Sequence, residues 1–218
     1  MILQWLKELL FPSKCILCRS ILEKGQQDLC PKCRAEAPEY PGGKGKLQFL
    51  DSYAAIWYYE DTVRRSLLRY KFYGARHYAH SFGRLLAMKL LREYPEGFDV
   101  LTWVPVSKLR KLRRGYDQVA LLADAVGREL GMTPRPLLKK IRNNPPQSGI
   151  QGQAKRRANV LGLYRVEHVK EIQGKRILLL DDILTTGATA GECARVLLTA
   201  GAEEVHCAVI AAARKNTK

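Results

Sequence analysis

The sequence predicts an α/β fold with a largely parallel sheet flanked by helices, preceded by a small cysteine module. After residue 48, apolar strand-like runs alternate with helical patterns, which is typical of a parallel sheet with helices on its faces. Before that point, four of the six cysteines form two close pairs. A Pro- and Gly-rich stretch at 38–48 predicts a linker between the two parts. We therefore expect an N-terminal helix and cysteine module over residues 1–40 and one α/β domain over residues 49–218.

The cysteine pairs are Cys15 with Cys18 and Cys30 with Cys33, each spaced Cys-x-x-Cys. Each short loop can place two thiolates on one ion, and two such loops are typical of tetrahedral zinc. Disulfides and a redox-active pair are the alternatives. Disulfides are disfavoured without a secretion signal, and redox pairs rarely occur in tandem. We predict a structural Zn²⁺ whose four thiolates leave no open coordination position.

The N-terminal segment, residues 1–11, has apolar side chains at helical spacing and predicts an amphipathic helix. It either packs on the rest of the protein or docks on a membrane surface or a partner. No apolar run approaches the roughly 18 residues of a membrane span. No small-residue cleavage site follows the segment, so we expect a cytoplasmic protein. A homo-oligomer is compatible with the sequence.

The α/β part divides into strand-like and helical segments in chain order. The expected strands are 53–59, 99–106, 137–141, 161–166, 176–180 and 205–212. The expected helices are 77–94, 116–130 and 187–200, the last two stopped by Gly131 and Gly201. Residues 145–158 are polar and predict a loop. Cys193 and Cys207 fall on the last helix and the last strand, where we expect small buried side chains.

One segment carries a candidate ligand site. The buried-type strand 176–180 delivers two adjacent acids, Asp181 and Asp182, and a Thr- and Gly-containing turn then opens a helix. A helix N-terminus offers unpaired N–H groups to a phosphate, and the carboxylates can accept hydrogen bonds from the hydroxyls of a sugar. The alternative is a buried strand that ends in a capped helix. The turn residues are Thr185, Thr186, Gly187, Ala188 and Thr189.

The net charge of +16 is concentrated in the middle of the chain. Residues 62–160 hold 21 basic and six acidic side chains, whereas residues 1–61 are neutral. Soluble surfaces usually mix both signs, so this block predicts a polyanionic partner such as nucleic acid or a phosphate-rich substrate.

The acid pair and its turn resemble the signature that binds phosphoribosyl pyrophosphate (PRPP) in type I phosphoribosyltransferases. With the cysteine pairs, the segments 104–108, 113–122, 146–149 and 156–160 resemble the ComF family of competence-associated proteins. The resemblance implies that Asp181 and Asp182 contact the ribose hydroxyls and that the turn holds the 5′-phosphate. It also implies a pyrophosphate loop at Val106, Ser107 and Lys108, with Mg²⁺ bound alongside PRPP.

Two main functions follow from the resemblance, and a third is a PRPP-responsive regulator that changes its affinity for DNA or protein without turnover. The first is a transferase that displaces pyrophosphate at C1 of PRPP, with an electrostatically stabilised transition state. The second is a non-catalytic accessory protein of DNA uptake that binds single-stranded DNA, with competence-machinery proteins as further partners. We expect the DNA contacts at Arg110, Lys111, Arg113, Arg114, Lys155, Arg156 and Arg157. The aromatic residues Tyr70, Phe72, Tyr73 and Tyr116 either stack on bases or pack in the core.

Overall fold

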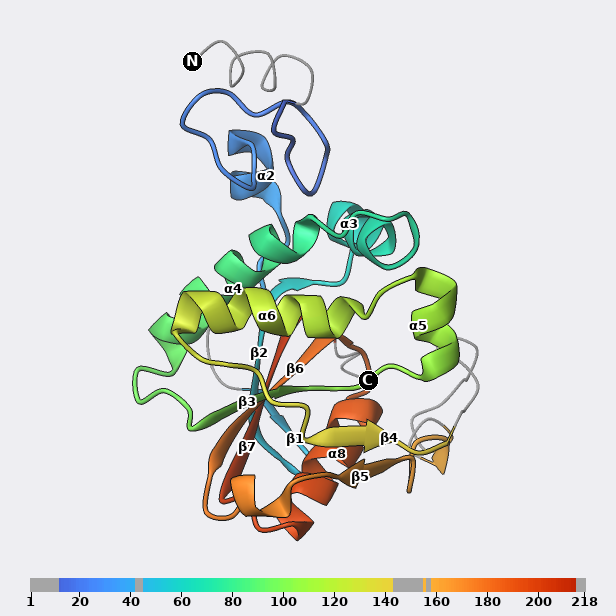
Figure 1. Cartoon of the computed structure of the whole chain (residues 1–218). Helices are drawn as coiled ribbons and strands as arrows, with labels where there is room; N and C mark the ends of the chain where they lie inside the picture. The colour runs from blue at the N-terminus through green and yellow to red at the C-terminus, as the bar shows by residue number, and fades with distance from the viewer. Residues whose placement is uncertain (1–11, 42–44, 143–154, 156–157, 215–218) are drawn as a thin grey trace.

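The computed structural model describes residues 12–41, 45–142, 155 and 158–214. It shows a central sheet with helices α3, α4 and α6 on one face and helix α8 with a small hairpin on the other (Figure 1). The cysteine module extends from the α3–α4 side. The helix predicted for residues 1–11 lies outside the described residues.

The sheet has the order β1-β2-β7-β6-β3. Strands β2, β7, β6 and β3 are mutually parallel, and β1 pairs antiparallel with β2 at one edge. The predicted, largely parallel sheet is therefore confirmed, and the carboxyl ends of four strands meet at one edge. The strand bounds are Gly45–Leu47 for β1, Leu50–Tyr58 for β2, Val100–Trp103 for β3, Arg176–Leu184 for β6 and Glu204–Ala212 for β7.

Three helices cover the first face: α3 (Asp61–Phe72), α4 (Tyr78–Glu93) and α6 (Gln118–Leu130). They share a core with Leu178 and Leu180 of β6. Helix α3 falls within the basic block and was not predicted as a helix. Its buried positions Val63, Leu67 and Tyr70 nevertheless follow helical spacing, and this stripe packs into the core.

The second face carries α8 (Ala188–Thr199) and a hairpin of β4 (Leu138–Lys140) and β5 (Tyr164–Val166). A short 3₁₀ helix, η2 (Val169–Glu171), follows the hairpin. This face packs against Ile177 and Leu179 of β6. Cys193 and Cys207 are fully buried in the same core, which confirms the expectation for both cysteines.

Two other segments also differ from the prediction. Part of the stretch predicted as a linker pairs with the sheet, because the Tyr40 N–H donates to the Ile56 carbonyl at 2.9 Å and residues 45–47 form β1. Residues Lys108–Arg114, for which no helix was predicted, form helix α5, with Ser107 as its N-cap and Gly115 as its C-cap. The Ser107 hydroxyl accepts from the Arg110 N–H at 3.3 Å, and Gly115 adopts the left-handed conformation that favours glycine.

Candidate functional site

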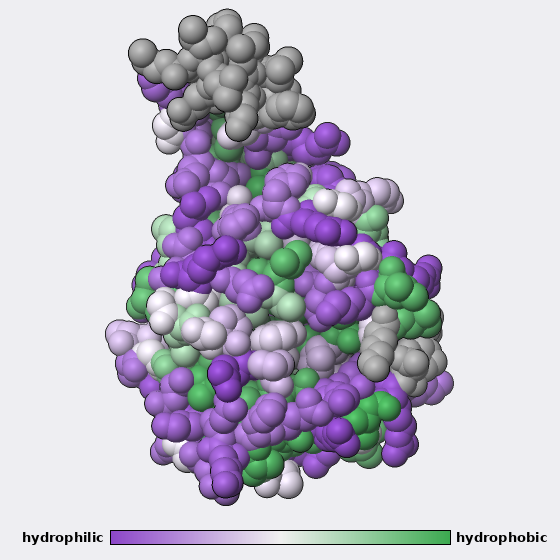
Figure 2. Space-filling model, in the orientation of Figure 1, coloured by the Kyte–Doolittle hydropathy of each residue, from purple (hydrophilic) through white to green (hydrophobic). Residues whose placement is uncertain are grey.

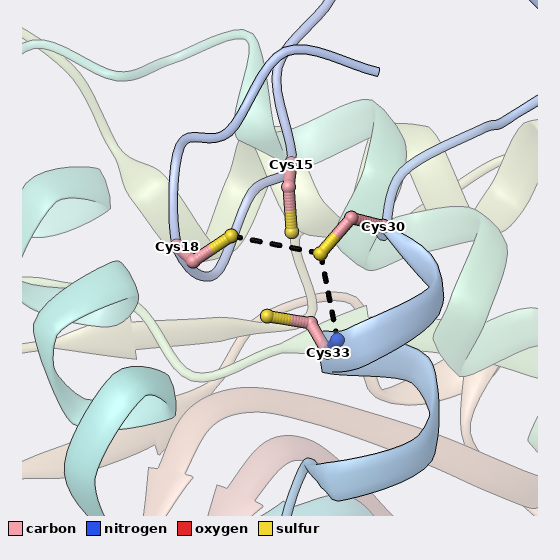
Figure 3. A group of neighbouring side chains, drawn as sticks. All are labelled: Cys15, Cys18, Cys30 and Cys33. Carbon is pink, nitrogen blue, oxygen red and sulfur yellow. Dashed lines mark hydrogen bonds between the residues drawn. The ribbon is translucent and has the colours of Figure 1, made fainter. Parts of the chain in front are cut away.

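The four cysteines of the N-terminal module converge on one point. The sulfur atoms of Cys15, Cys18, Cys30 and Cys33 all lie within 4.8 Å of one another, and the Cys18 and Cys30 sulfurs are 3.6 Å apart (Figure 3). Four sulfurs around a zinc ion at about 2.3 Å are separated by roughly 3.8 Å, so the cluster fits tetrahedral zinc after small adjustments. All described cysteines are free thiols. The predicted zinc ligands are therefore brought together.

Local structure favours the thiolate form of Cys30, whereas burial raises the pKa of the Cys33 thiol. Cys30 is the N-cap of helix α2 (Pro31–Glu36), and its sulfur accepts the Cys33 N–H at 3.4 Å. This backbone hydrogen bond lowers the pKa of the Cys30 thiol. The thiolate is the metal-binding form of cysteine. The position of Cys30 at the start of α2 therefore favours its role as a zinc ligand.

The acids Asp181 and Asp182 lie within strand β6 rather than after it. The predicted strand ended at Leu180, but β7 continues alongside and pairs Asp181 with Val209 and Leu184 with Ala212. Side chains alternate along a strand, so the two carboxylates point to opposite faces of the sheet. Asp182 faces the α3–α6 side, where it contacts Lys71 and Gln118. Asp181 faces the α8–hairpin side, near Lys140.

Asp182 is buried and has both oxygens engaged. Its Oδ1 pairs with Lys71 Nζ of α3 at 2.8 Å, and its Oδ2 accepts from Gln118 Nε2 of α6 at 3.0 Å. Neither Lys71 nor Gln118 was singled out from the sequence, because each lies far from the acid pair along the chain. The arrangement keeps a carboxylate in a fixed orientation at the sheet edge.

Asp181 has a different environment. Its Oδ1 accepts the backbone N–H of Asp182 at 2.8 Å. Burial and the neighbouring Asp182 carboxylate raise the pKa of Asp181 to about 8. Lys140 and Arg110 are the two cations on this side of β6. Burial is the main cause that lowers the pKa of Lys140 to about 8, and the charge of Arg110 adds to it. The nearby Asp181 carboxyl acts in the opposite direction and raises the pKa of Lys140. Cations therefore flank the acid pair on both faces of β6.

The turn after β6 begins helix α8. Gly187 is the N-cap and adopts φ +76°, a left-handed conformation that favours glycine. The Thr186 hydroxyl accepts from the Ala188 N–H at 3.4 Å. A Cβ at position 187 would lie 2.6 Å from Leu47 Cδ1, so the β1–β2 turn also requires glycine here. A cavity of about 290 Å³ opens between this turn and residues 47–49.

The predicted pyrophosphate loop lies beside the acid pair. Val106, Ser107 and Lys108 follow β3, the direct neighbour of β6, and the Val104 N–H donates to the Leu180 carbonyl at 2.9 Å. Both segments leave the sheet at the same edge. The structure thus brings together the acids, the Thr/Gly turn and the start of α5.

The basic and aromatic residues divide into two groups. Helix α5 carries Arg110, Lys111, Arg113 and Arg114 near the site, whereas Lys155 is exposed and Arg156 and Arg157 lie outside the described residues. Tyr70 and Tyr116 are core residues. Phe72 and Tyr73 are 58% and 78% exposed, and the Arg114 guanidinium lies 4.8 Å from the Phe72 ring centroid.

Comparison with known proteins agrees with this architecture. Residues 117–218 match the phosphoribosyl transferase domain family, and residues 6–43 match the double zinc ribbon domain family. Both the predicted phosphoribosyltransferase-like fold and the zinc module are thereby confirmed.

Among the described helices, none combines the length and apolar character that a membrane crossing requires.

Several curated proteins are similar over most of the chain. Competence protein ComFC of Bacillus subtilis strain 168 is 29% identical over 198 residues, which cover 86% of this chain and 78% of that protein. Competence protein ComFC of Streptococcus pneumoniae strain R6 is 30% identical over 197 residues, covering 88% and 84%. DNA utilization protein YhgH of Salmonella typhi is 29% identical over 202 residues, covering 88% and 87%. The chain therefore belongs to the ComF family of phosphoribosyltransferase-like proteins with an N-terminal zinc module.

Proposed function

We propose that this protein binds PRPP with Mg²⁺ at the carboxyl end of β6 and acts in the uptake of DNA. The observation that carries the proposal is the acid pair near the carboxyl end of β6 in a parallel sheet, with the left-handed Gly187 turn that opens α8 directly after that strand. Ligands of such sheets bind at this edge. The names of the competence and DNA utilization relatives support the link to DNA.

In this proposal each part of PRPP has its own protein partner. The first N–H groups of α8 and the hydroxyls of Thr185, Thr186 and Thr189 hold the 5′-phosphate. Asp181 and Asp182 accept hydrogen bonds from the ribose hydroxyls. The segment Val106, Ser107 and Lys108 contacts the pyrophosphate from the neighbouring strand. Mg²⁺ prefers oxygen ligands, which the pyrophosphate and the ribose hydroxyls would supply, together with the Asp181 carboxylate once it has lost the proton that its raised pKa retains.

The reaction that fits this site is displacement at C1 of PRPP. The bond from C1 to the pyrophosphate oxygen breaks, pyrophosphate leaves with both bonding electrons, and a nucleophile of the acceptor forms the new bond at C1. Carboxylates near the ribose would stabilise the positive charge that develops on the ring, and Mg²⁺, when bound, would supply charge that neutralises the leaving pyrophosphate. Pyrophosphate release across candidate acceptors, with and without single-stranded DNA, measures turnover directly.

Calorimetric titration with PRPP and Mg²⁺ tests the binding site. Asp181→Asn and Asp182→Asn should each weaken binding, because every lost charged hydrogen bond is worth about 1.5–3 kcal/mol. Single variants separate the two carboxylates, since these face opposite sides of β6. Asp124→Asn, an exposed acid of α6, is the matched control and should bind like the wild type. Equal affinity of the wild type and the double Asn variant would show that the ligand binds elsewhere.

A second candidate function is binding of single-stranded DNA, favoured by the exposed aromatic residues at the end of α3. The Phe72 ring lies against Arg114 of the basic helix α5, and the exposed Tyr73 follows Phe72 in the chain, which gives base-stacking surfaces close to phosphate-binding cations. Figure 2 shows mostly hydrophilic side chains over this side of the molecule, with hydrophobic ones gathered at α5. Leu109 and Leu112 are the exposed apolar side chains of α5.

Fluorescence anisotropy of a labelled oligonucleotide at two salt concentrations tests this function. Charge reversal of Arg113 and Arg114 to Glu should weaken binding and reduce its salt dependence, because fewer counterions are released. The control reverses Lys170 and Lys175, which are exposed near the amino end of β6. Tyr73→Ala should cost about 1–3 kcal/mol if one base stacks there. Equal losses for both charge reversals would contradict a specific DNA surface at α5.

A further inference from the structure

Helix α3 contacts the zinc module through hydrogen bonds to the first cysteine knuckle. The Ser66 hydroxyl donates to the Ile16 carbonyl at 2.5 Å, and Arg69 Nη2 donates to the carbonyls of Ile16 and Leu17 at 3.1 and 2.5 Å. Ile16 and Leu17 are the two residues between Cys15 and Cys18, so zinc coordination fixes the position of both acceptors.

Arg69 depends on these carbonyls. The Nε atom of Arg69 is buried and has no hydrogen-bond partner. The guanidinium therefore relies on the two hydrogen bonds that Nη2 donates to the knuckle carbonyls. The guanidinium also lies 5.9 Å from the Tyr78 ring centroid, within cation–π range. Loss of the knuckle carbonyls would leave a partly buried cation poorly solvated, which would favour a shift of the helix.

The last turn of α3 reaches the acid pair. Lys71 Nζ lies 2.8 Å from Asp182 Oδ1, with the Lys71 and Asp182 side chains only 16% and 9% exposed. Tyr70 adds a second connection, because its hydroxyl donates to the Gln118 carbonyl at 2.5 Å and the Gln118 side chain donates to Asp182 Oδ2. One oxygen of Asp182 is thus held directly by α3, and the other by a residue of α6 whose backbone carbonyl Tyr70 contacts.

The helix between these contacts behaves as a rigid body. Ser66 and Lys71 are five positions apart, which corresponds to about 7.5 Å along the helix axis. Val63, Leu67 and Tyr70 of α3 are fully buried in the core, so the helix cannot bend or rotate without repacking that core. A displacement imposed at the knuckle therefore reaches Lys71.

We propose that Lys71 is a positioning residue for Asp182 and that α3 links the zinc knuckle to the PRPP site. This inference rests on the proposed function of the acid pair. The Lys71 ammonium fixes the orientation of the carboxylate that accepts the ribose hydroxyl. It also offsets the negative charge of the two acids beside a ligand that brings several phosphate charges of its own. Zinc in the module thereby supports ligand binding through a chain of contacts in one helix.

Calorimetry with PRPP and Mg²⁺ on full-length variants tests the Lys71 assignment. Lys71→Met should weaken binding about tenfold, equivalent to about 1.4 kcal/mol, while the zinc content stays at one equivalent. Lys71→Arg keeps the charge and should restore most of the affinity. Arg65→Met removes an equal charge from an exposed position of the same helix and should bind like the wild type. If Lys71 merely competed with the ribose for Asp182, Lys71→Met would bind more tightly, which would overturn the assignment.

A double-variant cycle tests the link to the knuckle. Arg69→Met, with zinc retained, should weaken PRPP binding several-fold in the wild type but have no further effect in Lys71→Met. Cys18→Ser should lose zinc and lower the affinity for PRPP by a similar factor. If Cys18→Ser does not fold, Arg69→Met alone still tests the link. Independent, additive effects of Arg69→Met and Lys71→Met would refute the link.

Hydrogen exchange without ligand separates this inference from the proposed function. Arg69→Met should speed amide exchange in residues 67–72 and 180–184, whereas Arg65→Met should not. A wild-type protein that fails to bind PRPP would refute the proposed function, while the exchange result would still decide the coupling. Unchanged exchange at 180–184 in Arg69→Met would overturn the coupling even if PRPP binds.

Discussion

Replacement of Gly187 by Ala should damage both the fold and the PRPP site. Gly187 has φ +76°, and a non-glycine residue in the left-handed region costs about 1–2 kcal/mol. The new Cβ would also lie 2.6 Å from Leu47 Cδ1. Because that atom ends a flexible side chain, its displacement adds about 1 kcal/mol, at the low end of overpacking costs. We expect the free energy of unfolding to fall by about 2–3 kcal/mol in urea denaturation.

Two further variants separate the components of this loss. Gly131→Ala has a similar φ of +68° with no atom within 4 Å of the added Cβ, so it reports the backbone cost alone. Leu47→Ala combined with Gly187→Ala should recover the steric part of the loss. PRPP affinity should fall for Gly187→Ala and stay unchanged for Gly131→Ala. Equal destabilisation by both single variants, with intact PRPP binding, would refute the argument that the turn requires glycine at 187.

Three further predictions concern the zinc module and the acid pair. Cys30→Ser should lower the zinc content below one equivalent and lower the melting temperature, as metal analysis and calorimetry would show. Arg84→Met should cost about 2 kcal/mol of stability by leaving buried Asp28 without its bidentate partner, measured against Arg65→Met. Because the pKa of Asp181 is raised to about 8, the folded chain holds a proton that the unfolded chain releases near pH 4. Ligand-free stability should therefore fall as pH rises from about 4 to 8, and Asp181→Asn should flatten this slope.

Much of the fold could be predicted from local patterns. The continuous apolar run of β6 and the helix that begins after Gly187 are both visible in the sequence, as are the two cysteine pairs. These features depend on residues close together in the chain, such as the turn chemistry of Gly187 and the spacing of Cys15 and Cys18. Local patterns report local structure, so these predictions hold.

Other features depend on tertiary contacts. Helix α3 was not predicted from the sequence because its exposed positions are mostly basic. Its buried positions Val63, Leu67 and Tyr70 nevertheless form one apolar face. The extension of β6 through the acid pair depends on the neighbouring strand β7, which supplies backbone partners beyond Leu180. Lys71 meets Asp182 only because α3 packs across the sheet edge. Long-range contacts of this kind leave no signal in a single sequence.

A crystal structure grown with PRPP and Mg²⁺ tests the central claim most directly. We predict ribose hydroxyls within hydrogen-bond distance of Asp181 and Asp182, the 5′-phosphate on the N–H groups at the start of α8, and the pyrophosphate at Val106, Ser107 and Lys108. Lys71 should still contact Asp182 in the complex. PRPP bound away from the end of β6, or a site that stays empty at saturating ligand, would contradict the account.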